Sequence, residues 1–316
     1  MGDASIVDAH VHVWADDRQQ YPMVPGQERP AEHRGSTDWL VELMDSCGVA
    51  GALLVQTPWY GEDNRYFVDS MRRFPGRFVS LGYLDDPLAA DAAEKLSHQY
   101  HAAGFRGIRL HLNDPRVGEG AAAGKADRLI RRAGELGVPV QFLNRMPNMP
   151  LIHQLAARFA DVTMIVDHLG HPDMSEGPPY PAAQPFFALG ELPNIYVKVA
   201  VHHSHSQVPY PWHDLREYQQ RTLDSFGPQR LLWGSNFPMS MPADDHGGAA
   251  APDPGPALTS HPTYAQRLDA VRTELPFLTE TDRAWLLGKT AATLWAFSAA
   301  DAGDAPYPSR STATPR

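Results

Sequence analysis

The stretch RLLWGSNFP (residues 230–238) is the last of eight short apolar runs, and the number of runs decides the fold. Longer amphipathic or Ala-rich segments separate the runs, whose centres are spaced by roughly 30 residues, the size of one strand–helix unit. Eight alternations predict an α/β protein with a parallel sheet closed into a (β/α)8 TIM barrel. The runs are SIVDAHVHVW (5–14), VAGALLVQT (49–57), RFVSLGYLD (77–85), FRGIRLHLN (105–113), PVQFLNR (139–145), TMIVDHLG (163–170), IYVKVAV (195–201) and RLLWGSNFP (230–238).

Helices are expected between the runs, and a single domain is expected over residues 1–299. The competing arrangement, a doubly wound open sheet, normally carries a Gly-rich phosphate fingerprint after its first strand, and none follows here. A loop rich in Pro, Gly and Ala (239–262) either lies over the barrel mouth or is a disordered insertion, and the tail 300–316 is expected to be disordered. The expected helices are 37–47, 63–74, 92–103, 125–136, 149–159, 214–226 and 280–297.

Composition and charge narrow the possible partners. The net charge is −10 and no basic patch stands out, which argues against a nucleic-acid partner. No apolar run approaches the roughly 18 residues of a membrane span, and the acidic N-terminus does not resemble a signal peptide. The single cysteine, Cys47, cannot form an internal disulfide. We therefore expect a cytoplasmic protein that binds a small molecule, and the sequence does not indicate its oligomeric state.

The first run ends in two histidines with the spacing of a convergent site. His10 and His12 are two residues apart on an extended chain, so both side chains point the same way. If that face is the barrel interior, the two imidazoles suit a divalent metal or a substrate oxyanion. Two hydrogen-bonded core histidines are the alternative.

Polar side chains also close most of the other runs, where a barrel places its active site. His168 ends the sixth run and Asn236 the eighth. Arg109 suits a bidentate clamp on a substrate carboxylate, and a structural salt bridge is its alternative. Lys198 lies inside an apolar run, so its charge needs a partner or its pKa must fall. The further candidates for substrate binding are His111, Asn144, Arg145 and Tyr60, and Gln141 also lies in the fifth run.

Four motifs together resemble the amidohydrolase superfamily over residues 5 to 297: VDAHVHVW, GIRLHL, VDHLGHPD and LLWGSNFP. The likeness is to the branch that contains sugar lactonases and 2-pyrone-4,6-dicarboxylate lactonase. It implies a (β/α)8 barrel that hydrolyses a lactone, with catalytic residues His10, His12, His168 and Asn236. It also implies either no metal or one divalent ion, zinc or manganese, on His10, His12 and His168. Imidazoles without a carboxylate make a poor site for such an ion.

Position 236 departs from that family pattern. The family usually has an aspartate there, which acts as general base on the attacking water, whereas an amide cannot accept a proton near neutral pH. We expect a hydrolase acting on the lactone of a small carboxylated metabolite, in a form that an Asp-to-Asn replacement at Asn236 makes inactive. The alternatives are a decarboxylase, dehydratase or isomerase on the same scaffold, and a catalytically silent binding protein.

Overall fold

The computed structural model describes residues 5–26, 35–199, 205–239, 241 and 262–297. In this part of the chain, eight parallel strands alternate with helices, and each strand lies within one of the eight apolar runs. The predicted alternation is therefore confirmed. The strands are β1 (Ile6–Val11), β2 (Val49–Val55), β3 (Phe78–Leu81), β4 (Ile108–His111), β5 (Val140–Leu143), β6 (Met164–Val166), β7 (Ile195–Val199) and β8 (Leu231–Trp233).

The strands form a closed ring. They pair in the order β1-β2-β3 and, separately, β4-β5-β6-β7-β8. A bridge between Gly82 and Ile108 joins β3 to β4, and a bridge between Val11 and Phe237 joins the segment after β8 to β1. At the second junction, His12 N donates to Phe237 O over 2.6 Å. The sheet thus returns to its first strand, as a barrel requires.

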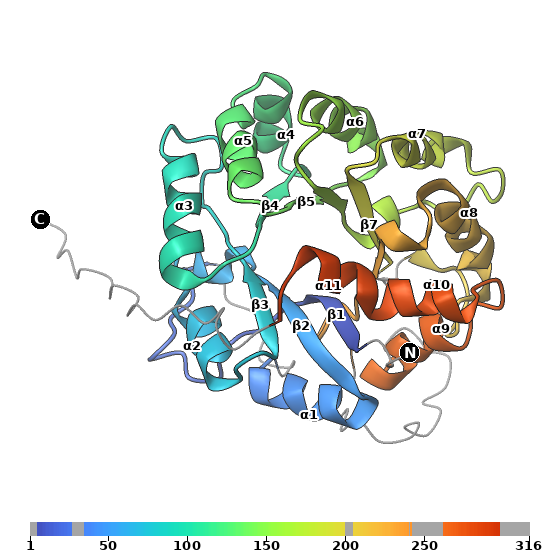
Figure 1. Ribbon diagram of the computed structural model, residues 1–316, viewed down its shortest axis with the longest axis horizontal. Helices are drawn as coiled ribbons and strands as arrows, with labels where there is room; N and C mark the ends of the chain where they lie inside the picture. Colours follow the sequence, from blue (N-terminus) through green and yellow to red (C-terminus); the bar gives the residue numbers. More distant parts are fainter. Residues whose placement is uncertain (1–4, 27–34, 200–204, 240, 242–261, 298–316) are drawn as a thin grey trace, which may run out of the picture.

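Helices surround this ring (Figure 1). The helix at 37–47 lies where the sequence predicted it, because Ser36 caps its first turn and Gly48 ends it in the left-handed region at φ 70°. The α-helices are α1 (Thr37–Cys47), α2 (Arg65–Arg73), α3 (Ala92–Ala103), α4 (Pro115–Ala122), α5 (Asp127–Glu135), α6 (Met149–Arg158), α7 (Gln184–Ala188), α8 (Arg216–Phe226), α9 (Tyr264–Arg272), α10 (Glu280–Ala284) and α11 (Thr290–Leu294). The shorter turns are η1 (Pro58–Tyr60), η2 (Met146–Asn148), η3 (His168–Gly170), η4 (Pro181–Ala183), η5 (Leu189–Glu191), η7 (His213–Leu215) and η8 (Pro228–Arg230).

The predicted single helix over 280–297 is interrupted. A π-helical turn, η9 (Trp285–Lys289), separates α10 from α11. Within this turn Gly288 lies so close to β1 that a Cβ atom there would be 1.9 Å from the carbonyl oxygen of Ser5. The close approach requires glycine, and the wider turn allows the chain to pass β1 without leaving the helix.

The lower part of the barrel interior is apolar, and α11 covers it from the N-terminal ends of the strands. Trp295, directly after α11, packs against Val7 and Ala9 of β1, and its indole nitrogen donates to Arg106 O over 3.0 Å. Figure 1 shows α11 crossing β1 and β2. The strand residues of this interior cluster are Val7, Ala9, Leu53, Val55, Val79, Leu81, Ile165 and Leu232. The opposite ends of the strands therefore remain for a site.

Two predictions from the sequence concern segments that lie largely outside the described residues. Of the loop 239–262, the structure describes only residues 239, 241 and 262, and the tail 300–316 is not described. In the described part of the chain, every helix is too short or too polar to cross a bilayer.

Candidate active site

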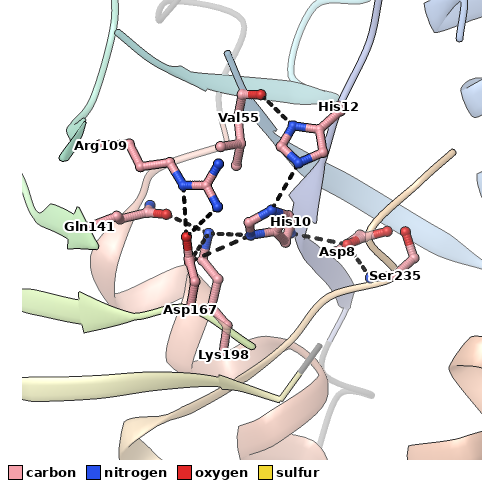
Figure 2. A network of polar contacts seen from close by, with 9 residues as sticks. All are labelled: Asp8, His10, His12, Val55, Arg109, Gln141, Asp167, Lys198 and Ser235. Carbon is pink, nitrogen blue, oxygen red and sulfur yellow. Dashed lines mark hydrogen bonds and ion pairs between the residues drawn. The ribbon is translucent and has the colours of Figure 1, made fainter. Parts of the chain in front are cut away.

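Six buried polar side chains meet inside the barrel at the carboxyl ends of the strands, next to the apolar interior cluster. They are called the polar layer below. The strand register aims them inward, because Arg109 pairs with Gln141 and Lys198 pairs with Leu232, a member of the interior cluster. Figure 2 shows Arg109, Asp167 and Lys198 on one side of His10, and Asp8 with Ser235 on the other. The six are His10, His12, Arg109, Gln141, Asp167 and Lys198, and none is more than 7% exposed.

A shift in the register of β1 points the side chains of His10 and His12 into the polar layer. The register of β1 against β2 shifts between Asp8 and Val11, so the alternation of side chains is broken there. Asp8 consequently points away from the histidines' partners: its carboxylate accepts from Ser235 N at 2.9 Å and from the Tyr264 hydroxyl at 2.9 Å. Burial raises the pKa of Asp8 to about 6. Asp8 thus fastens β1 to the segment after β8 and to α9.

The protons on the two histidines follow from their partners. His12 Nδ1 lies 2.7 Å from Val55 O, which only accepts, so His12 Nδ1 carries the proton. Burial lowers the pKa of His12 to about 3 and that of His10 well below its usual range, so both rings are neutral. His12 Nε2 must therefore accept from His10 Nε2, 3.2 Å away. His10 Nδ1 is left as an acceptor.

Lys198 supplies the donor to His10. Its ammonium nitrogen lies 3.1 Å from His10 Nδ1, donates to Gln141 Oε1, and lies 3.5 Å from Asp167 Oδ1. Burial lowers the pKa of Lys198 to about 8, and the Asp167 carboxylate opposes that shift, so the side chain is mainly charged at neutral pH. A hydrogen-bonded chain thus runs from Lys198 through His10 and His12 to the backbone of β2.

Arg109 forms a buried ion pair with Asp167. Its Nε and Nη2 atoms each lie 2.7 Å from Asp167 Oδ2. Burial alone would raise the pKa of Asp167, but the charges of Arg109 and Lys198 outweigh burial and hold it well below its usual range. The salt bridge that the sequence left open for Arg109 is therefore present. The layer holds two cations and one carboxylate.

His168 and Asn236 come from strand ends with the same backbone conformation. Both have positive φ, 52° for His168 and 59° for Asn236, a region in which Asn and His occur more often than most residues. The ring of His168 lies 4.5 Å from that of His10, centroid to centroid. Asn236 N donates to His10 O over 2.9 Å, which places position 236 beside the first histidine. The structure therefore places the rings of His12 and His168 and the backbone of Asn236 next to His10.

The remaining predicted substrate-binding residues differ in how exposed they are to solvent. Among the described residues, His111 Nε2 and both amide atoms of Asn144 are buried without a hydrogen-bond partner, which suits groups that wait for a ligand. Arg145 is exposed. Tyr60 is 1% exposed, and its hydroxyl accepts from Ala15 N over 2.8 Å, so it holds the loop after β1.

Asp167 was missed by reasoning from the sequence. It precedes His168 at the end of a buried strand, and a carboxylate in that place is itself a signal. His171 was missed too. Its ring lies 5.0 Å from that of His168, and its Nδ1 atom lies 3.2 Å from His205 Nε2. The row of imidazoles that begins at His12 therefore continues past His168.

A metal ion has suitable spacing but unsuitable surroundings. Ligand atoms of His10, Asp167 and His168 lie within 4.8 Å of one another, a group that contains Asp167 in place of the predicted His12. Two of the nearby lone pairs are already used, because His10 Nδ1 accepts from Lys198 and Asp167 Oδ2 accepts from Arg109, and the Lys198 ammonium lies 3.5 Å from Asp167 Oδ1. Two cations next to the only carboxylate of this group disfavour a third positive charge. The residues present do not fit a divalent ion.

The comparisons agree with this fold. The amidohydrolase family model matches residues 7–297. The chain is 26% identical over 246 residues to 2-pyrone-4,6-dicarboxylate hydrolase of Comamonas testosteroni, covering 74% of this chain and 77% of the relative. It is 27% identical over 255 residues to L-fucono-1,5-lactonase of Burkholderia ambifaria, covering 78% and 84%. A solved amidohydrolase of Burkholderia multivorans with bound zinc superposes with a TM-score of 0.68 at 21% identity, covering 93% of this chain and 99% of the other.

Proposed function

The chain belongs to the amidohydrolase family, and from its site we propose that it hydrolyses a lactone that carries a carboxylate or another anionic group. The lactone-hydrolysing relatives support the reaction. The match over residues 7–297 supports one domain over 1–299, and the lone free thiol of Cys47 supports a cytoplasmic location.

The balance of charge in the polar layer carries the proposal for an anionic substrate. Within the described part of the chain, Arg109 and Lys198 both form their ion pairs with the carboxylate of Asp167, and a buried charge without a counter-charge is costly. Asp8 faces away from the layer, where three donors already hold its carboxylate. An anionic group of the substrate, or the oxyanion that forms during hydrolysis, offsets the excess positive charge.

The side chains divide the work of hydrolysis as follows. The unpartnered atoms of His111 and Asn144, with exposed Arg145 at the same ends of the strands, orient the substrate. Asn236 binds the attacking water or the ring carbonyl through its amide. Burial keeps His168 neutral because it holds the imidazole pKa well below its usual range, so His168 takes the proton of the water. Because its pKa is lowered, this imidazole is a weaker base than an exposed one, and we expect slow turnover.

Asn236 also favours a second candidate, a decarboxylase, dehydratase or isomerase that needs no base at the end of β8. The same excess positive charge binds a carboxylate in either case. The product distinguishes them, because hydrolysis adds one water to the substrate and the other reactions do not. A silent binding protein binds the anion and releases it unchanged.

The anionic preference is tested by comparing a carboxylated lactone with its methyl ester. We expect the carboxylate to bind at least about tenfold more tightly, a difference of about 1.4 kcal/mol, measured by calorimetry. Arg109→Met is expected to abolish this preference, and Arg116→Met, which removes a charge paired with Asp86 on the surface, is expected to keep it. Equal binding of acid and ester by the unchanged chain contradicts the proposal.

A further inference from the structure

We propose that the Lys198 ammonium is a built-in cation of this barrel, which takes the place of a divalent metal ion and excludes one. The proposal concerns metal binding alone and holds whatever the substrate is. It starts from where Lys198 lies: next to the last residue of β7, fully buried, with its side chain inside the barrel.

The atoms around Lys198 Nζ form a coordination shell. Its neighbours are His10 Nδ1 at 3.1 Å, the Gln141 Oε1 atom that accepts from it, and Asp167 Oδ1 at 3.5 Å. They come from β1, β5 and the end of β6, so three different strands converge on one nitrogen. All three atoms are acceptors, and an ammonium has three donors to give. One imidazole nitrogen and two oxygens are also a ligand set that a divalent cation accepts.

The ammonium also withholds the histidines from a metal. Because Lys198 donates to His10 Nδ1, His10 must donate from Nε2 to His12, and His12 must donate from Nδ1 to Val55 O. In this arrangement each ring uses both nitrogens. A metal ion that displaced Lys198 would have to reverse this chain of donors or break it.

Removing the ammonium should therefore create a metal site. Lys198→Met keeps an unbranched side chain and frees His10 Nδ1 and Asp167 Oδ1. His168 lies close enough to supply a third ligand, since the ligand atoms of His10, Asp167 and His168 lie within 4.8 Å of one another. Of the two described cations that pair with Asp167, Arg109 then remains.

The test is the metal content of the purified proteins, together with their zinc affinity measured by competition with a chromogenic chelator. We expect the unchanged chain to hold almost no metal and to take up no zinc, and Lys198→Met to bind about one equivalent. Lys125→Met removes an exposed lysine charge and is expected to behave as the unchanged chain does.

Two results overturn the proposal. One is an unchanged chain that carries stoichiometric zinc, and the other is a folded Lys198→Met that takes up none. If circular dichroism shows that Lys198→Met does not fold, Lys198→Leu, which likewise has neither a charge nor a hydrogen-bond donor, replaces it under the same criteria. Neither result depends on lactone hydrolysis, so failure of the proposed reaction and failure of the built-in cation are separate outcomes.

Discussion

At the scale of single residues, Asn236 has a backbone conformation that suits the site and a side chain that cannot act as a base. Its backbone is fixed, because Asn236 N donates to His10 O and Met239 N donates to Asn236 O, each over 2.9 Å. Its φ of 59° suits Asn and Asp alike. Exchanging one for the other therefore changes the charge beside His10 and leaves the backbone as it is. Asn and Asp differ at one atom, an amide nitrogen in place of a carboxylate oxygen, and only the carboxylate can accept a proton near neutral pH.

Arg109 shows what a residue's own sequence context leaves open. The pattern GIRLHL indicated a cation at the mouth of the barrel, and both a substrate clamp and a salt bridge remained possible. The partner, Asp167, lies two strands further round the barrel. It belongs to the motif VDHLGHPD, from which only His168 was predicted as a site residue. Pairing over 58 residues of chain depends on the closed barrel, and no local pattern encodes it.

Asp8 yields a prediction on the pH dependence of stability. Burial raises the pKa of Asp8 from 3.8 to about 6, so its proton is held more tightly in the folded chain than in the unfolded one. Its contribution to the free energy of unfolding is fully present below pH about 4 and is lost as the pH rises through about 6.

Asp8→Asn imitates the protonated acid and keeps an oxygen for the two backbone donors. Relative to the unchanged chain, we expect it to gain up to about 3 kcal/mol of unfolding free energy between pH 4 and pH 8, measured by urea denaturation. Asp161→Asn, at an exposed aspartate, serves as the control. A difference between Asp8→Asn and the unchanged chain that does not vary with pH shows that Asp8 is not held in this way.

At the scale of elements, the strands were predictable and their inner faces only partly so. All eight apolar runs contain a strand, because short apolar runs with polar ends describe buried parallel strands well. The register shift in β1 was not predictable, since alternation alone would place Asp8 with His10 and His12. The hydrogen bond from the Tyr264 hydroxyl to Asp8 stabilises the shifted register, and it joins residues 256 positions apart in the chain.

The C-terminal helical segment, residues 280–297, shows the same limit for helices. Its apolar periodicity predicted one helix over 280–297, and the interruption at η9 follows from the contact between Gly288 and Ser5. The apolar periodicity of α11 did not indicate that this helix covers the barrel at the N-terminal ends of the strands.

Trp295 tests the role of that cover. It is 3% exposed and packs inside the barrel, so Trp295→Ala is expected to lower the free energy of unfolding by about 3–5 kcal/mol. The half-buried Trp285 lies on the preceding turn and is the matched position, at which alanine should cost clearly less. Urea denaturation measures both, and equal losses would mean that α11 does not support the barrel.

At the scale of the whole molecule, the chain combines a net charge of −10 with a buried layer in which two cations face one carboxylate. The sequence alone placed Arg109 at a strand end and Lys198 inside an apolar run. It could not show that Lys198, Arg109 and Asp167 share one centre, because that meeting is a property of the closed ring. The same holds for the metal question, since Lys198 bears on it only once its nitrogen is located beside His10.

The most direct test of the central claim is the mass of the product formed from a carboxylated lactone in isotopically labelled water. It is measured for the unchanged chain and for Asn236→Asp, with Asn113→Asp as a control that adds the same charge at an exposed position. We predict that the product gains one labelled water, slowly with the unchanged chain and the control, and faster by a factor of about 100 or more with Asn236→Asp. Loss of carbon dioxide, or a lactone left intact by both the unchanged chain and Asn236→Asp, would contradict hydrolysis.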